Sequence, residues 1–407
     1  MDAGTSDTAC MVRKMYFLML SKVLGLFVPT NQNKWIFGSE MGHSYSSNSK
    51  YLFTFIRQEK KNIRAIWISK RRSVVRKILE AGGEACFNFS HRGILHCVSA
   101  GTYFCSTDPS DIMLVRVRTC RVINLWHSVT IKKVVYDRWP ERLGVSPWRR
   151  VLRSLMGRPT FEDVDLHIAT SGSQVQVLSS AFNSSDFAIC GQPREDVLFT
   201  EELSSIGQKI KSYLEITNKK LVLYMPTHRD YGNGSICPTI FQNNAKAKEI
   251  LEQHNAVAFT KNHVNMQKKV RPYVDRRGTV REITLLSIDT QELLCAADVL
   301  VTDYSSCYIE YLHLNRPIIF YHYDNYTTED NALYFSEKDI MPGPIVRDER
   351  ELLNAIVAAL GSPSLYSGAR EEVRDFFYDH QDGNSSDRVY RQAVCQENAQ
   401  IPGMKSA

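Results

Sequence analysis

Short apolar runs rich in β-branched residues alternate along this chain with longer amphipathic stretches of helical period. Such runs, bounded by Gly, Pro, Asn or Ser, predict buried strands, and the stretches between them predict covering helices. The predicted strands are Trp35–Gly38, Arg64–Ser69, Val122–Trp126, Leu166–Thr170, Leu221–Met225, Ala256–Thr260, Val299–Thr302 and Pro317–Tyr321. The predicted helices include Asn48–Gln58, Ser173–Phe182, Leu203–Tyr213, Ala245–Gln253 and Glu349–Leu360. This alternation is typical of an α/β fold with parallel sheets.

The pattern changes near residue 200, where a charged helix begins at Thr200 and a lysine pair after Asn218 leads into a new strand. Each half of the chain is long enough for one doubly wound domain. We therefore expect a first domain over 31–200, a second over 201–395, and a disordered tail over 396–407. Ligands of such domains bind at the carboxyl ends of the strands, so two domains of this kind predict a cleft lined by both sets of strand ends.

The first part of the chain, residues 1–30, is apolar but interrupted. Lys22 divides the apolar segment Met11–Val28 into blocks that are much shorter than the roughly 20 residues of a membrane-spanning helix. An amphipathic helix lying on the cytosolic face of a membrane is one interpretation. A helix that packs on the protein's own core is the other, because amphipathicity does not say what the apolar face contacts.

The composition is that of an ordinary globular protein. Of 407 residues, 43% are hydrophobic and 23% are charged, which argues against wholesale disorder. The 10 cysteines form no Cys-x-x-Cys pair, so the chain is neither a zinc module nor a disulfide scaffold, and we expect reduced, mostly buried thiols in a cytosolic protein. No His-x-x-x-His pair is present either, and no metal site is expected.

Positive charge is concentrated in one stretch. The whole chain carries +6, but eleven Lys and Arg residues face only two acids between Arg116 and Arg158, and Trp139 and Trp148 are interleaved with them. This pattern favours contact with a phosphate polymer or an anionic membrane, although a solvated helical face is the plainer alternative. No helix-turn-helix, zinc-finger or RNP pattern supports nucleic-acid binding. The proposed acceptor or membrane surface comprises Lys132, Lys133, Arg138, Arg149, Arg150 and Arg153.

Polar and basic side chains follow several predicted strands. His127 follows the strand that ends at Trp126, and histidine is the side chain best suited to proton transfer near neutral pH. A lone histidine is more often structural. Two further strand ends carry similar groups, namely Thr227, His228 and Arg229 in one case and Lys261 and His263 in the other. Together these groups describe a phosphate-handling site.

The segment from Ala297 to Tyr321 reads as strand, polar turn, short helix and strand. The turn contains Asp303, Ser305 and Ser306, so free backbone N–H groups and two hydroxyls would favour a diphosphate there. The alternative is that Asp303 or Ser305 only caps the helix. The segment has neither the dinucleotide-binding glycine fingerprint nor the glycine context of a hydrolase nucleophile.

These segments together resemble the CDP-glycerol glycerophosphotransferase family, which builds teichoic acids and related capsule polymers. The resemblance covers about residues 12–394. It rests on Phe37–Ser39, Tyr45–Leu52, Trp126–His127, Gly191–Phe199, Tyr224–Asp230, Lys261–His263, Asp298–Tyr321 and Asp382–Arg388.

The resemblance implies a GT-B-like fold, in which two Rossmann-like doubly wound domains face a central cleft. It implies transfer of a polyol phosphate, most simply glycerol phosphate, from a CDP-polyol to a hydroxyl of a membrane-linked acceptor, with release of CMP. His127 would be the general base, and His263 would stabilise or protonate the diphosphate. The donor-binding residues would be Thr227, Arg229, Lys261, Asp303, Ser305, Ser306, Glu310, Asp382 and Arg388.

The same resemblance implies its partners. They are a CDP-polyol donor, a lipid-linked or polymeric phosphate-containing glycan acceptor, and an anionic membrane surface. No cofactor beyond the substrate is expected, and the protein would be peripheral on the cytoplasmic face of the cell membrane. Two alternatives are a GT-B glycosyltransferase that uses a nucleotide-sugar and a non-catalytic scaffold of the same fold.

Overall fold

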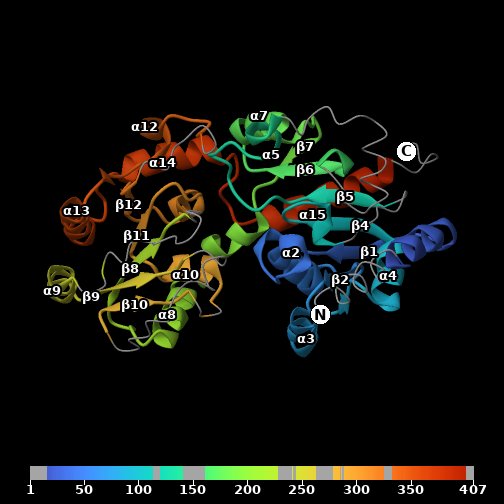
Figure 1. The fold of residues 1–407 in the computed structure, drawn as a ribbon, viewed down its shortest axis with the longest axis horizontal. Helices are drawn as coiled ribbons and strands as arrows, with labels where there is room; N and C mark the ends of the chain where they lie inside the picture. Colours follow the sequence, from blue (N-terminus) through green and yellow to red (C-terminus); the bar gives the residue numbers. More distant parts are fainter. Residues whose placement is uncertain are drawn as a thin grey trace, which may run out of the picture. The chain divides into compact units, whose positions relative to one another are not determined.

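The computed structural model describes residues 16–112, 120–140, 161–227, 241, 244–262, 278–284, 286, 288–324 and 332–399 (Figure 1). The chain forms two compact units. The first contains the chain up to His127, Val134–Asp196 and the part from Asp382 onward, and the second contains Ser128–Lys133 and Val197–Gln381. The main change of unit, at 196/197, lies just before the boundary expected at 200.

The first unit is built on a seven-stranded sheet in the order β3-β2-β1-β4-β5-β6-β7, and all of its strand pairs are parallel. Its strands are β1 (Asn31–Phe37), β2 (Arg64–Ser69), β3 (Ala85–Phe87), β4 (Ala100–Cys105), β5 (Arg121–Asn124), β6 (Leu166–Ala169) and β7 (Phe187–Ile189). Its helices are α2 (Ser47–Glu59), α3 (Arg72–Glu80), α4 (His91–Val98), α5 (Val135–Arg138), α7 (Gly172–Phe182) and α15 (Ser385–Ala399), besides a helix over 16–27. Short 3-10 turns occupy Glu40–Gly42, Pro109–Asp111, Phe161–Asp163 and Pro193–Phe199.

The second unit is built on a six-stranded parallel sheet in the order β10-β9-β8-β11-β12-β13. Its strands are β8 (Lys220–Met225), β9 (Ala256–Thr260), β10 (Val280–Glu282), β11 (Val299–Thr302), β12 (Ile318–Tyr321) and β13 (Ile345–Val346). Its helices are α8 (Leu203–Tyr213), α9 (Ala245–Gln253), α10 (Thr290–Ala296), α11 (Cys307–Tyr311), α12 (Glu337–Ile340), α13 (Glu349–Gly361) and α14 (Ser367–Phe377), with a 3-10 turn over Leu312–Leu314. Buried apolar side chains cover both faces of this sheet, as expected for parallel strands.

All eight predicted strands and all five named helices are confirmed. The sequence missed five strands of the described chain. Four of them, β3, β7, β10 and β13, have only two or three residues, which is too short for a periodic pattern. The fifth, β4, begins with Ala-Gly, a dipeptide of low strand propensity, although every residue of the strand is buried.

The C-terminal helix α15 belongs to the first unit, whereas the sequence placed residues up to 395 in the second domain. Figure 1 shows α15 beside α2. Val389 and Ala393 of α15 are buried in the same apolar cluster as Trp35 of β1. The helix also continues to Ala399, so the tail expected over 396–407 begins with ordered residues.

The short segment Ser128–Lys133 belongs to the second unit, although the sequence placed it in the first domain. Its apolar side chains Val129 and Ile131 are buried in the core of the second unit. The Lys133 N–H donates to Ala332 O at 2.8 Å, which adds a backbone anchor. The chain therefore changes unit at 127/128 and 133/134 as well as at 196/197 and 381/382.

The helix over 16–27 packs on the first unit with one side and leaves apolar side chains exposed on the other. Phe17, Leu20 and Leu24 contact the apolar cluster beneath β1, β2 and α4. Leu26 and Phe27 are 78% and 79% exposed. The core-packing interpretation is therefore confirmed for one side of this helix only. Among the described residues, no helix is long and apolar enough to cross a membrane.

Candidate active site

His127 follows the carboxyl end of β5 and is exposed. Its Nδ1 lies 3.3 Å from Ser106 O, and its ring lies beside Trp126, with the ring centroids 4.2 Å apart. Because a carbonyl oxygen only accepts hydrogen bonds, Nδ1 carries the proton in this contact, and Nε2 is the basic nitrogen of the neutral ring. The geometry thus presents a histidine whose tautomer suits a general base.

The backbone before His127 is held in an unusual conformation. Trp126 has φ of +54°, a left-handed conformation that costs energy for a bulky residue. Asn124 Oδ1 accepts the Trp126 N–H at 2.9 Å, and Asn48 Nδ2 donates to Trp126 O at 2.9 Å. These buried amides fix the direction in which the chain leaves β5 and therefore the position of His127.

The start of α2 supports the same edge of the sheet. Ser49 N and Oγ lie 3.0 and 2.7 Å from Ser106 Oγ, and Asn48 Oδ1 accepts from Arg194 N at 3.1 Å. Asn48, Ser49 and Ser106 are all buried. The Tyr45–Leu52 segment thus makes hydrogen bonds to the ends of β4 and β5 and to the Gly191–Phe199 segment, at the edge of the sheet that carries His127. In the sequence, this segment contributed only to the family resemblance.

Asp111 is a positioning residue that the sequence missed. Its Oδ2 accepts the N–H groups of Ser106 and Thr107, both at 2.8 Å, and its Oδ1 accepts from Met41 N. Ser106 in turn supplies the carbonyl oxygen that His127 contacts. Burial raises the pKa of Asp111 to about 7. In sequence, an aspartate after Asp-Pro-Ser reads as a turn residue, so nothing local signals this role.

The raised pKa of Asp111 predicts a pH-dependent stability. The folded state binds the Asp111 proton more tightly than the unfolded state, in which the pKa is near 3.8. This tighter binding stabilises the fold fully below pH 3.8, and the stabilisation is lost as the pH rises through about 7. We expect the free energy of unfolding of the wild type to fall relative to that of Asp111→Asn in this window, by up to ~1.4 kcal/mol per pH unit. Urea unfolding at several pH values measures it, and parallel curves for the two proteins would contradict it.

In the second unit, polar groups converge at the carboxyl ends of β8 and β11. Asp303 Oδ1 accepts from Thr227 N at 2.8 Å and from Thr227 Oγ1 at 2.6 Å, and Asp303 is fully buried. Thr302 Oγ1 donates to Met225 O at 2.7 Å across the same two strands. Two of the candidate donor-binding residues, Thr227 and Asp303, are thus in direct contact at the ends of two neighbouring strands.

Ser305 and Ser306 follow Asp303 and are half-buried. Helix α11 begins directly after them but has only five residues before it tightens into a 3-10 turn that ends at Asn315, in left-handed conformation with φ of +46°. Ser306 makes no side-chain capping hydrogen bond. With only five α-helical residues, α11 contributes little dipole, so a ligand here would depend on the hydroxyls and backbone N–H groups.

Lys261 and Glu310 hold the neighbouring part of the second unit. Lys261 Nζ donates to Ile288 O at 2.8 Å and lies 3.3 Å from Thr290 Oγ1, and burial lowers its pKa. Glu310 is buried and accepts a hydrogen bond from Gln291 Nε2. Both side chains therefore stabilise the start of α10, whatever they also contact in a donor.

The sequence missed His322, which follows β12. Its Nδ1 lies 3.1 Å from Tyr304 OH, the two rings stack with centroids 4.1 Å apart, and Glu337 lies 3.8 Å away. Polar residues that directly follow a parallel strand are candidate ligand-binding residues, and His322 directly follows the strand predicted to end at Tyr321.

Asp382 and Arg388 lie in the first unit, where they pair with each other. Two N–O contacts of 2.8 Å join them and hold the pKa of Asp382 well below its usual range. Arg388 Nε also donates to Cys190 O at 3.0 Å, and Gly191 has φ of +80° and no room for a Cβ beside Ser385 Oγ. These residues fix the start of α15 and belong to the first unit, whereas Ser305 belongs to the second.

The remaining predicted residues divide into two groups. Arg229, His263, Arg149, Arg150 and Arg153 lie outside the described residues. Lys132 and Lys133 belong to the second unit, whereas Arg138 belongs to the first, so the predicted basic surface does not lie on one domain. In the part of the chain that the structure describes, no three or more His, Cys, Asp or Glu residues are grouped so that they could hold a metal ion.

The sequence of this chain also matches a known protein family. The family model described as CDP-glycerol:poly(glycerophosphate) glycerophosphotransferase matches residues 20–394. The chain belongs to this family. Membership confirms the predicted enzyme class, a transferase that moves a polyol phosphate from a CDP-polyol, with CDP-glycerol as donor and a teichoic acid chain as acceptor implied by the family.

Several curated proteins are similar to this glycerophosphotransferase. A teichoic acid glycerol-phosphate transferase of Staphylococcus aureus is 26% identical over 395 residues, which are 92% of this chain and 94% of the relative. A teichoic acid poly(glycerol phosphate) polymerase of Bacillus spizizenii is 24% identical and is covered over 86% of its length. A protein of the same description from Bacillus subtilis is covered over only 45%.

The fold of this family member is also shared with a solved structure. The wall teichoic acid polymerase TagF superposes with a TM-score of 0.78 at 20% identity, covering 97% of both chains. This likeness, with the two parallel sheets, confirms the α/β, GT-B-like fold class.

Proposed function

We propose that this glycerophosphotransferase adds glycerol phosphate, or another polyol phosphate, to a hydroxyl of a membrane-linked acceptor in teichoic-acid-like or capsular polymer synthesis. The observation that carries the proposal is the exposed His127, whose Nδ1 faces a carbonyl oxygen and whose basic nitrogen is therefore Nε2. The buried supports of this histidine, Asn48, Ser106 and Asp111, give it a fixed position from which to act.

In the proposed step, the acceptor hydroxyl oxygen attacks the phosphorus that carries the polyol. His127 Nε2 takes the hydroxyl proton as the new P–O bond forms, and the bond from this phosphorus to the bridging oxygen breaks. CMP leaves with that oxygen, so no covalent enzyme intermediate is needed. Positioning and charge stabilisation supply the remaining rate enhancement.

For the donor, we propose binding at the strand ends of the second unit. The half-buried hydroxyls of Ser305 and Ser306 would contact the diphosphate, and the Thr227–Asp303 pair would hold the turn that presents them. His263, Arg229 and Lys261 would neutralise charge, and Glu310 would support the site. We propose no metal or other cofactor. Asp382 and Arg388 act in this proposal as supports of α15.

We also propose a peripheral location on the cytoplasmic face of the cell membrane. The helix over 16–27 presents exposed apolar side chains, and apolar side chains on a helix that lies flat favour the lipid interface. The exposed residues are Tyr16, Met19, Val23, Leu26 and Phe27. The basic residues Arg138, Arg149, Arg150 and Arg153 would add attraction to anionic lipids.

The membrane proposal predicts the effect of a double substitution. Leu26→Ser with Phe27→Ser removes two exposed apolar side chains without opening the core, so the protein should fold normally and bind anionic vesicles at least about tenfold more weakly. Vesicle sedimentation measures the partition. Leu79→Ser, which removes an exposed leucine from α3, is the matched control. Equal binding by the double variant and the control would contradict the proposal.

The donor screen tests the proposed reaction. The protein is incubated with an acceptor-bearing membrane fraction and either CDP-glycerol, CDP-ribitol or a nucleotide-sugar. We expect CMP from a CDP-polyol and no sugar transfer. Sugar transfer without CMP release would support the glycosyltransferase alternative, and no product from any donor would support the non-catalytic scaffold.

A further inference from the structure

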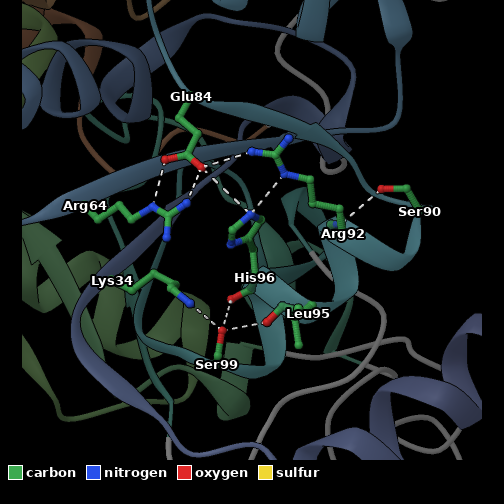
Figure 2. Close-up of polar contacts among 9 residues, drawn as sticks. Lys34, Arg64, Glu84, Ser90, Arg92, Leu95, His96 and Ser99 are labelled. Carbon is green, nitrogen blue, oxygen red and sulfur yellow. Dashed lines mark hydrogen bonds and ion pairs between the residues drawn. The ribbon is translucent and has the colours of Figure 1, made fainter.

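A second group of cationic side chains lies away from the strand ends discussed above, at the edge where β1 and β2 begin (Figure 2). Lys34 and Arg64 are direct neighbours in the register of these two strands. Alternate residues of a strand share a face of the sheet, so Lys34 and Arg64 lie on the same face as Ile36 and Ile66. The two isoleucines pack in the cluster covered by α4 and the helix over 16–27. Like charges side by side on one sheet face are destabilising, so their pairing calls for a compensating group.

One carboxylate compensates only part of this charge. Glu84 accepts from Arg64 Nε at 2.9 Å and Nη2 at 2.6 Å, and it lies 3.6 Å from Arg92 Nη2. Within the described part of the chain, the one hydrogen bond of Lys34 Nζ goes to Ser99 Oγ, at 2.6 Å, and burial together with the charge of Arg64 lowers the pKa of Lys34. Among the described residues, three basic side chains, Lys34, Arg64 and Arg92, therefore share one acid, Glu84.

His96 of α4 adds an unused donor to the group. Its ring is buried, with the residue 8% exposed, and Arg92 Nε lies 3.5 Å from its Nε2. Glu84 Oε1 also lies 3.8 Å from Nε2. In the neutral tautomer in which Nε2 accepts from Arg92, and equally in the protonated ring that Glu84 would favour, Nδ1 carries a proton. His96 Nδ1 is buried and has no hydrogen-bond partner among the described residues. A buried donor without an acceptor is destabilising, and an anion that accepts from it would remove this cost.

We propose that Lys34, Arg64 and His96 form a binding site for a phosphate-bearing anion, separate from the site of transfer. Figure 2 shows the Lys34 ammonium, the Arg64 guanidinium and the His96 ring facing a common space. A tetrahedral phosphate there would accept from Lys34 Nζ, from the Arg64 nitrogen that Glu84 does not use, and from His96 Nδ1. The proposal does not depend on the transfer reaction, because none of these residues has a part in it.

Two sources could supply such a phosphate. The helix over 16–27 lies on the same face as α4, where Tyr16 OH lies 3.2 Å from His91 Nε2 and the Phe17 and His91 rings are in contact. Its last residues, Leu26 and Phe27, are exposed and precede β1 by only a few residues, so an anionic lipid headgroup is one source. A soluble or polymeric phosphate is the other.

Titration with inorganic phosphate tests the site, with the histidine ring resonances of the full-length protein as the readout. We expect a saturable shift of one resonance, assigned to His96 by its loss in His96→Gln, and an affinity at least about tenfold lower in Lys34→Met. Lys77→Met, which removes an exposed lysine from α3 of the same unit, should titrate like the wild type. A chloride titration at matched ionic strength that gives the same shift, or an unchanged affinity in Lys34→Met, would overturn the proposal.

Vesicles then distinguish the two sources. If the anion is a lipid headgroup, phosphatidylglycerol vesicles should shift the His96 resonance where phosphatidylcholine vesicles do not, and Lys34→Met should bind them more weakly. If it is a soluble or polymeric phosphate, Lys34→Met should lose phosphate affinity and keep its vesicle binding. Thermal unfolding of each variant confirms that it is folded.

Discussion

Replacing His127 by asparagine is expected to lower kcat for polyol phosphate transfer by roughly 10²–10⁴-fold. The side chain is exposed, and its Nδ1 contact with Ser106 O leaves Nε2 as the base, so the substitution removes proton acceptance without disturbing the core. The effect should fall on kcat with little change in the KM for the CDP-polyol, because the proposed donor contacts lie elsewhere.

The control for this variant is His380→Asn. His380 is also exposed, and it lies in the second unit just before the start of α15, outside the proposed sites. It should retain wild-type kcat, and both variants should unfold at the wild-type temperature. A His127→Asn protein that is folded and retains most of its kcat would show that the base is another group.

Asp303→Ala is expected to affect both stability and donor binding. The fully buried carboxylate accepts two hydrogen bonds from Thr227, so its removal leaves a backbone N–H and a hydroxyl without an acceptor. We expect a loss of about 2–4 kcal/mol in the free energy of unfolding. The turn that carries Ser305 and Ser306 should also lose its fixed position, and CDP binding should weaken at least about tenfold.

Thr227→Val separates the two hydrogen bonds. It removes the hydroxyl and keeps the backbone N–H that donates to Asp303, so it should cost only about 1 kcal/mol. Urea unfolding and calorimetric titration with CDP measure both variants. If Asp303→Ala kept wild-type stability and CDP affinity, the turn at Asp303 would not be part of the donor site.

Local sequence patterns predicted the elements and the strand ends because those features depend on near neighbours in the chain. Thr227 and Asp303 each follow an apolar run, and parallel pairing of those runs brings them together. His322 lies in the same kind of position, because it directly follows the apolar run that forms β12.

Long-range packing limited the rest of the prediction. Val129 and Ile131 look like loop residues beside His127, yet they are buried in the second unit. Helix α15 follows the second domain in sequence, but Val389 and Ala393 are buried against the first. Neither segment carries a local sequence signal of the unit to which it belongs, because its place depends on apolar side chains that contact residues far away in the chain.

The supports of His127 were unpredictable for a related reason. Asn48 and Asp111 are polar residues of types that are usually exposed, and only the folded sheet shows that both are buried and hydrogen-bonded to backbone groups. Their role follows from the position of β4 and β5, and the sequence did not predict β4.

The central claim is that the chain moves a polyol phosphate to an acceptor hydroxyl with release of CMP. The most direct measurement follows CDP-glycerol labelled in the glycerol, with an acceptor-bearing membrane fraction, and compares label in the polymer with CMP released. We expect equal molar amounts in the wild type, and rates of both products at least about 100-fold lower in His127→Asn. Release of CMP without label in the acceptor, or labelling by His127→Asn at a rate close to that of the wild type, would contradict the account.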